Sequence, residues 1–117
     1  MFGRFRLRRA LSKIITSLKL SPDALYVFQR GVDGILPDVK TRKLDPVQGC
    51  VLLISNTLVQ GATNGALKAT KEQLPALYDE MKILWVFCGE CVRTDYDRFA
   101  PVLVVGKLKG SPFDEVE

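Results

Sequence analysis

The sequence predicts an α+β fold: a single domain with an antiparallel sheet of about five to six strands and two helices, in the order α-β-β-β-β-α-β-β. Three observations support this prediction. An amphipathic segment lies near the N-terminus, several short runs are rich in β-branched and aromatic residues, and Asp-Gly and Asn-Gly pairs suit tight hairpin turns. A length of 117 residues suits one domain, which we place at 1–117.

Residues 5–19 have the pattern of an amphipathic helix. Apolar side chains recur at helical spacing and share one face, namely Leu7, Leu11, Ile14, Ile15 and Leu18. The opposite side is polar and basic. Because Pro22 cannot continue a helix, we expect Ser21-Pro22-Asp23 to end it.

Two strands joined by a hairpin are expected next. Residues 24–32 are rich in Tyr, Val and Phe, and Asp33-Gly34 tolerates the positive φ angles of a two-residue turn. The return strand, residues 35–44, contains Pro37, which lacks a backbone donor. We therefore place this strand at the edge of the sheet.

The run at 49–59 is the most strand-like part of the chain. Its residues from Val51 to Ile54 are apolar on both faces, which predicts a central strand. Asn64-Gly65 then predicts a second hairpin, with a short return strand at 66–69.

A second helix is predicted from Thr70 to about Lys82. Thr70 and Gln73 have the spacing of a capping box, and Pro75 predicts a bend. Two further strands are expected at 83–92 and 101–108, and an acidic tail at 110–117.

Positive charge is concentrated at the N-terminus. Residues 1–22 hold six basic side chains and no acidic one: Arg4, Arg6, Arg8, Arg9, Lys13 and Lys19. The rest of the chain has 11 Lys and Arg against 13 Asp and Glu, so the net charge of +4 arises in this segment. Such an uneven distribution is typical of contact with an anionic partner.

Three classes of partner fit this charge: a nucleic acid, an anionic membrane surface, or an acidic patch on another protein. Arginine predominates, and its guanidinium group matches phosphate geometry, so nucleic acid is preferred. In a peripheral membrane protein of matrix-like or accessory kind, Phe2 and Phe5 would be the apolar anchors. The composition also fits a mitochondrial transit segment, or a helix whose charges are merely solvated.

A second basic cluster, Lys40, Arg42 and Lys43, falls on the expected edge strand. Charge on an edge strand discourages aggregation, which is one explanation. The other is that this cluster extends the anion-binding surface of the N-terminal helix, provided the two lie side by side. Exposed strand edges would also allow two chains to pair as a homodimer.

The chain offers little for catalysis. It has no histidine, so neither a Ser-His-Asp nor a Cys-His arrangement can be built, and it has no glycine-rich phosphate loop. We expect a non-enzymatic interaction protein with no cofactor and no metal ion. Cys88-Gly89-Glu90-Cys91 has the spacing of a thiol-redox site and supports a third hypothesis, although the acids that follow do not favour a reactive thiolate.

The predicted location is the cytoplasm. Three cysteines fit a reducing compartment, and no apolar run approaches the roughly 18 residues of a membrane span. The segment 1–22 leaves a membrane-peripheral or mitochondrial location as alternatives.

Overall fold

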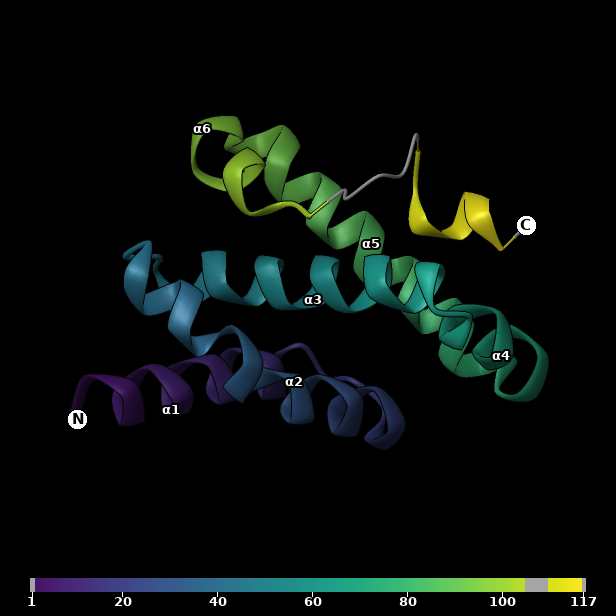
Figure 1. Ribbon diagram of the computed structural model, residues 1–117, viewed down its shortest axis with the longest axis horizontal. Helices are drawn as coiled ribbons and strands as arrows, with labels where there is room; N and C mark the ends of the chain where they lie inside the picture. The colour runs from purple at the N-terminus through teal and green to yellow at the C-terminus, as the bar shows by residue number, and fades with distance from the viewer. Residues whose placement is uncertain (1, 105–109, 117) are drawn as a thin grey trace.

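Six α-helices and two short 3₁₀ helices form the described part of the chain, residues 2–104 and 110–116 of this computed structural model. In chain order they are α1 (Phe2–Ser17), α2 (Pro22–Thr41), α3 (Pro46–Thr63), α4 (Ala66–Gln73), α5 (Pro75–Thr94), α6 (Tyr96–Phe99), η1 (Ala100–Val102) and η2 (Pro112–Glu115). Helix α3 runs through the middle, with α1 and α2 on one side and α5 and α6 on the other (Figure 1).

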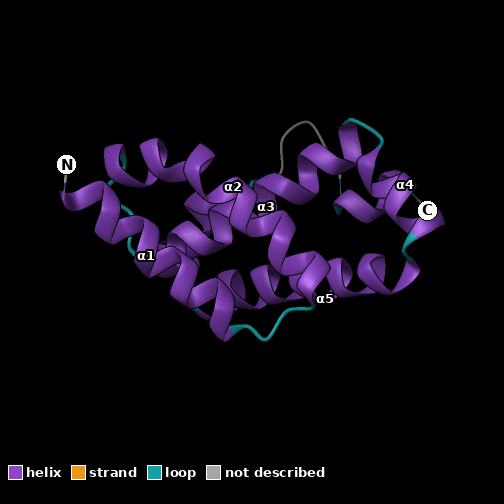
Figure 2. Cartoon of the chain, turned by 90° about the horizontal axis from the view of Figure 1, so that it is seen from below, coloured by secondary structure: helices purple, strands orange, loops and turns teal. Residues whose placement is uncertain are grey.

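The predicted α+β fold is wrong, because the described residues contain helices and no strand (Figure 2). The segments expected to be strands lie in helices: 24–32 and 35–44 in α2, 49–59 in α3, 66–69 in α4 and 83–92 in α5. The first residues of the strand expected at 101–108 belong to η1, and residues 105–108 lie outside the description.

Helix α3 is apolar on nearly all sides because helices cover it from both sides. Five successive residues are at most 6% exposed, namely Cys50, Val51, Leu52, Leu53 and Ile54. Such a run fits a central strand or a surrounded helix equally well. The surrounding helices, rather than neighbouring strands, bury it here.

Helix α2 buries residues at helical intervals. Ala24, Phe28, Val32 and Val39 are almost fully buried, and the steps between them match one face of a helix. The hairpin turn predicted at Asp33-Gly34 does not form. These two residues lie on the exposed side of this helix. Burial of the apolar stripe outweighs the local turn preference.

Prolines begin helices in this fold. They occupy the first turn of five elements, at Pro22, Pro46, Pro75, Pro101 and Pro112, where the missing N–H has no intrahelical partner to lose. Asp45 precedes one of them and accepts a 2.9 Å hydrogen bond from the Gln48 amide, while Gln48 Oε1 accepts one from Asp45 N. This capping box defines where α3 starts.

The turn at Asn64-Gly65 joins two helices. Gly65 has a φ of +85°, as expected for this pair, but it connects α3 to α4 rather than two strands. The capping box predicted at Thr70 and Gln73 does not form, because Thr70 lies inside α4 and its hydroxyl donates to the Ala66 carbonyl. The helix predicted from Thr70 is divided at Leu74 into α4 and α5.

The C-terminal segment packs against the helices. Ser55, the buried polar residue of α3, donates to the Val102 carbonyl at 3.3 Å and accepts from the Val104 amide at 3.0 Å. Further on, Phe113 meets the Tyr78 ring edge-on, with centroids 5.4 Å apart. Within the expected tail 110–117, η2 therefore contributes to the core. None of the helices described has the length and hydropathy needed to cross a bilayer.

Candidate anion-binding surface

Helix α1 separates an apolar face from a basic face, which confirms a helix here, although it spans Phe2–Ser17 instead of the predicted 5–19. The prediction that Ser21-Pro22-Asp23 ends this helix is wrong, because Ser21 caps α2 and Pro22 begins it. Leu11 and Ile15 are fully buried, and Leu7 and Leu18 pack partly buried beside them. A Cβ atom added to Gly49 of α3 would lie 2.8 Å from a Leu11 methyl carbon, so the two helices approach closely there. The apolar face is thus fixed on the body of the protein.

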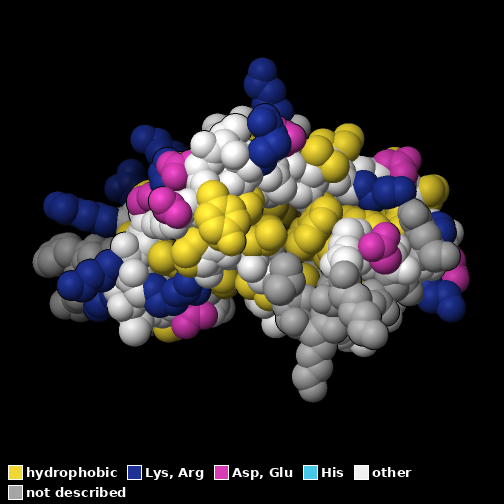
Figure 3. All heavy atoms as spheres, turned by 90° about the horizontal axis from the view of Figure 1, so that it is seen from above, with side chains coloured by type: hydrophobic (Ala, Val, Ile, Leu, Met, Phe, Trp, Pro, Cys, Tyr) yellow, Lys and Arg dark blue, Asp and Glu magenta, His cyan; other side chains and the backbone are white. Residues whose placement is uncertain are grey.

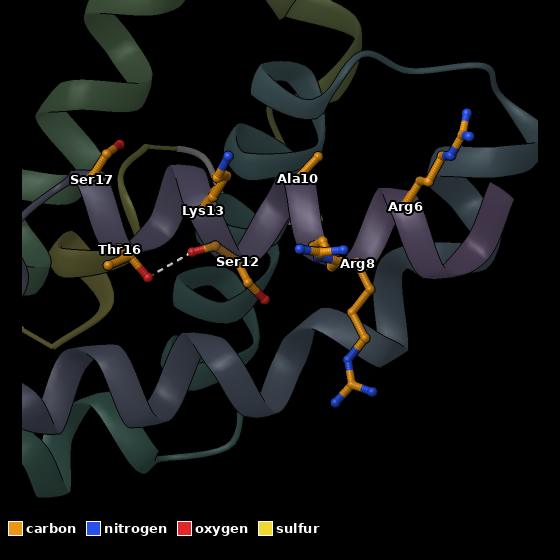
Figure 4. Close-up of a pocket in the computed structure, with 8 residues that line it drawn as sticks. Arg6, Arg8, Ala10, Ser12, Lys13, Thr16 and Ser17 are labelled. Carbon is orange, nitrogen blue, oxygen red and sulfur yellow. Dashed lines mark hydrogen bonds between the residues drawn. The ribbon is translucent and has the colours of Figure 1, made fainter. Parts of the chain in front are cut away.

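The outer side of α1 carries a row of cations. Arg6, Arg9 and Lys13 are exposed and follow one another at steps of three and four residues, which places them on one side of a helix. They line a shallow depression whose described lining comes from α1 alone (Figure 4). The rest of that lining is Arg8, Ala10, Ser12, Thr16 and Ser17. A single helix cannot enclose a cavity, so this is an open surface.

The cations of this row are available to a partner. Within the described part of the chain, Arg6, Arg9 and Lys13 form no hydrogen bond or ion pair with another side chain. Helix α1 has no acidic residue, and the partial positive charge of its N-terminal end adds to the same potential. We call Arg6, Arg9 and Lys13 the α1 basic row.

Arg8 lies on the flank that faces α2. Its Nε is 3.4 Å from Asp33 Oδ1, and Figure 4 shows its side chain directed away from that of Arg6. One turn along, Ser12 Oγ donates to Gln29 Oε1 at 3.1 Å. These two contacts explain why Arg8 and Ser12 do not belong to the row.

The hydroxyls beside the row are already engaged. Thr16 donates to the Ser12 carbonyl at 2.8 Å (Figure 4). Ser17 donates to the Ile14 carbonyl at 2.6 Å. The attraction for an anion therefore comes from the cations. Neither hydroxyl is among the predicted site residues, although helical spacing places Thr16 and Ser17 beside Lys13.

The second basic cluster is divided by the fold. Lys40, Arg42 and Lys43 lie at the C-terminal end of α2, not on an edge strand. Arg42 Nη2 donates to the Pro101 carbonyl at 2.7 Å, which directs it towards η1. Lys40 instead lines a pocket together with Leu7 of α1, so it alone is shown to adjoin that helix.

Lys43 has an unusual backbone conformation. Its φ of 54° lies in the left-handed region, which costs a residue other than glycine about 1–2 kcal/mol. It ends α2 in the place where glycine is common.

The homodimer prediction depended on exposed strand edges. Because the described residues contain no strand, those edges are absent.

For three of the predicted site residues the structure describes the backbone only. Phe2, Arg4 and Phe5 belong to the backbone of α1, but their side chains lie outside the description. The prediction that Arg4 joins the basic surface, and the prediction of Phe2 and Phe5 as membrane anchors, stay predictions.

The opposite side of the molecule has a different surface. In Figure 3, basic and acidic side chains alternate around a band of apolar ones. On α5, Ile83 and Val86 are 68% and 62% exposed. Helix α1 differs from this surface in that it contains basic residues and no acidic one.

The cysteines lie in a protected environment. Cys88 and Cys91 are in the C-terminal half of α5, and Cys88 and Cys50 are fully buried. Burial raises the pKa of Cys50 to about 12 and raises the pKa of Cys88 far above its usual range. Since the thiolate is the reactive species, this arrangement lacks the activation that a thiol-redox site needs.

No metal site is found among the described residues, where no three cysteine or acidic side chains are grouped suitably. Comparison of the chain with protein-family models, curated proteins and solved structures finds no match. The α1 basic row is therefore the feature of this chain that bears on function.

Proposed function

We propose that this is a non-enzymatic interaction protein that binds a polyanion through the outer side of α1, with nucleic acid as the preferred partner. The observation that carries the proposal is the α1 basic row, because Arg6, Arg9 and Lys13 are exposed and unpaired within the described chain. Packing of the fold does not require three unpaired cations on a helix without acidic residues. An anionic partner accounts for them.

The length of the row suits a phosphate backbone. From Arg6 to Lys13 the helix advances about 10 Å, at 1.5 Å for each residue. One strand of a duplex carries a phosphate about every 3.4 Å along the axis, so the row faces about three phosphates. The two arginines add planar donors that pair with phosphate oxygens in a bidentate manner.

The packing of α1 favours nucleic acid over a membrane. Insertion into a bilayer interface uses the apolar face of an amphipathic helix, but Leu11 and Ile15 are fully buried against α2 and α3. A membrane contact of the folded protein would depend on the charges alone, unless side chains outside the description take part. We therefore treat membrane binding as an outcome of the test.

The test compares two triple variants of equal charge. Arg6→Gln, Arg9→Gln and Lys13→Gln are combined in one protein, and Lys68→Gln, Lys71→Gln and Arg93→Gln, on α4 and α5, in the other. Binding to a fluorescein-labelled duplex of random sequence is measured by anisotropy. The first variant should lose affinity by roughly tenfold or more at low salt, because the lost phosphate contacts no longer release counterions.

Two results would contradict the proposal. Equal losses in both variants would mean that overall charge, and not the α1 basic row, attracts the oligonucleotide. Binding to vesicles containing phosphatidylserine, combined with no binding to the duplex, would replace nucleic acid by a membrane surface.

A further inference from the structure

We infer a second site, in which the pocket between α1 and α2 binds a small anion with an apolar tail, of the class of the medium-chain alkyl carboxylates. The pocket has a volume of about 280 Å³, and its described lining is Leu7, Leu36, Pro37, Lys40 and Thr41. Pockets for drug-sized ligands begin at about 300 Å³. The occupant is therefore small.

A proline inside α2 accounts for the pocket. Pro37 cannot donate to the carbonyl of Asp33, and its ring pushes the preceding turn away, so the helix bends there. The last part of α2 leads up towards the beginning of α3 (Figure 1). Helix α1 stays close to α3 through Leu11 and Gly49, and the pocket lies between α1 and the last part of α2.

The pocket has an apolar part and a charged part. Leu36 is 2% exposed, Leu7 is half-buried, and the Pro37 ring lies beside them, so these residues offer an apolar wall. Lys40 and Thr41 are exposed and supply an ammonium group and a hydroxyl. A carboxylate on Lys40 with its alkyl chain against Leu36 and Leu7 uses both parts.

The charge of the pocket selects an anion. No acidic residue is in its described lining, and Lys40 has no ion pair to a described carboxylate. An inorganic phosphate would leave the half-buried Leu7 in contact with water, whereas an alkylammonium ion would meet a like charge. Arg6, Arg9 and Lys13 do not line this pocket, so the inference is independent of the proposed function.

The probe is octanoate, titrated into the full chain by isothermal calorimetry. We expect saturable binding of one octanoate, with octylamine and butyrate at least tenfold weaker, because one has the wrong charge and the other a short tail. Lys40→Gln should weaken octanoate about tenfold. The matched control is Lys43→Gln, which removes a nearby cation that does not line the pocket, and it should bind like the unchanged protein.

A second variant tests the apolar wall. Leu7→Trp fills the pocket from a half-buried position and should abolish octanoate binding while the helical circular dichroism is retained. If this variant fails to fold, Lys40→Gln decides alone. Equal affinity of the unchanged protein and Lys40→Gln, or equal binding of octanoate and octylamine, would overturn the inference. Loss of binding in Ile83→Ser would place the ligand on the exposed face of α5 instead.

Discussion

Arg8 of α1 and Asp33 of α2 form an ion pair across the two helices, with Arg8 Nε 3.4 Å from Asp33 Oδ1. The two side chains are 58% and 56% exposed, and exposed pairs of this kind contribute at most about 1 kcal/mol to stability. A phosphate can therefore displace Asp33. Because its ion pair is weak, Arg8 can contribute its charge to an anion bound beside the α1 basic row.

Replacing Asp33 by asparagine should strengthen binding to a duplex oligonucleotide. The change removes a competing carboxylate and frees Arg8, while the free energy of unfolding should change by less than about 1 kcal/mol. Anisotropy and urea denaturation measure the two quantities. Asp38→Asn, an equal charge change on an exposed α2 residue without an ion pair to α1, should give a smaller gain. Equal gains would show that Arg8 is not released.

Glu80 joins α5 to the beginning of α2. Its Oε2 accepts from the Ser21 amide at 2.8 Å, and its Oε1 accepts from the Ser21 hydroxyl at 2.5 Å. Glu80→Ala should lower the free energy of unfolding by about 1.5–3 kcal/mol, because two hydrogen bonds to a charged group are lost. Asp79→Ala, next to it and exposed, should change it by less than about 0.5 kcal/mol. Urea denaturation of the two variants tests this; similar values would show that the Ser21 contact contributes nothing.

The Asp45–Arg98 pair should make stability depend on acid pH. Partial burial raises the pKa of Asp45, but the Arg98 side chain and the Gln48 amide outweigh it and hold that pKa below its ordinary value. A lowered folded-state pKa stabilises the protein above the unfolded value of about 3.9 and loses this effect as pH falls below it. Stability should therefore decrease below about pH 4 through this group.

Two substitutions separate the charge of Asp45 from its cap. Asp45→Asn keeps a capping side chain and should be less stable than the unchanged protein at pH 7, with the difference shrinking as pH falls below about 4. Asp45→Ala should cost about 1 kcal/mol more, because the cap is lost as well. Thermal denaturation from pH 3 to pH 7 measures both. A difference that stays constant with pH would show that the carboxylate charge is not involved.

Cysteine reactivity should follow burial. In the folded protein at pH 8, iodoacetamide should modify Cys91 first, since it is only partly buried, and leave Cys50 and Cys88 intact. Burial raises the pKa of the Cys91 thiol too, so its reaction should be slow. Mass spectrometry of timed samples tests this, and in guanidinium chloride all three should react. Rapid modification of Cys88 in the folded protein would restore the thiol-redox hypothesis.

Helix α1 and its basic row follow from the sequence, because an apolar stripe at helical spacing and a charged face coincide there. Helix α2 shows the same spacing at Phe28 and Val32, but Asp33-Gly34 favours a hairpin when neighbouring residues alone are considered. In α3 the apolar run fits a strand or a helix. The capping box of Asp45 and Gln48, directly beside Pro46, is the signal that distinguishes them.

The division of the second basic cluster lies beyond sequence reasoning. Lys40 adjoins Leu7 and Arg42 reaches Pro101 because α2 bends and folds back on α1. Residues distant in the chain decide these contacts, so no local pattern predicts them.

The most direct measurement of the central claim is the dependence of duplex binding on salt. For three phosphate contacts, the logarithm of the association constant should fall with the logarithm of salt concentration with a slope of about −3. Arg6→Gln, Arg9→Gln and Lys13→Gln should each make that slope less steep by about 1. A slope near zero, or one that none of the three substitutions changes, would contradict the account.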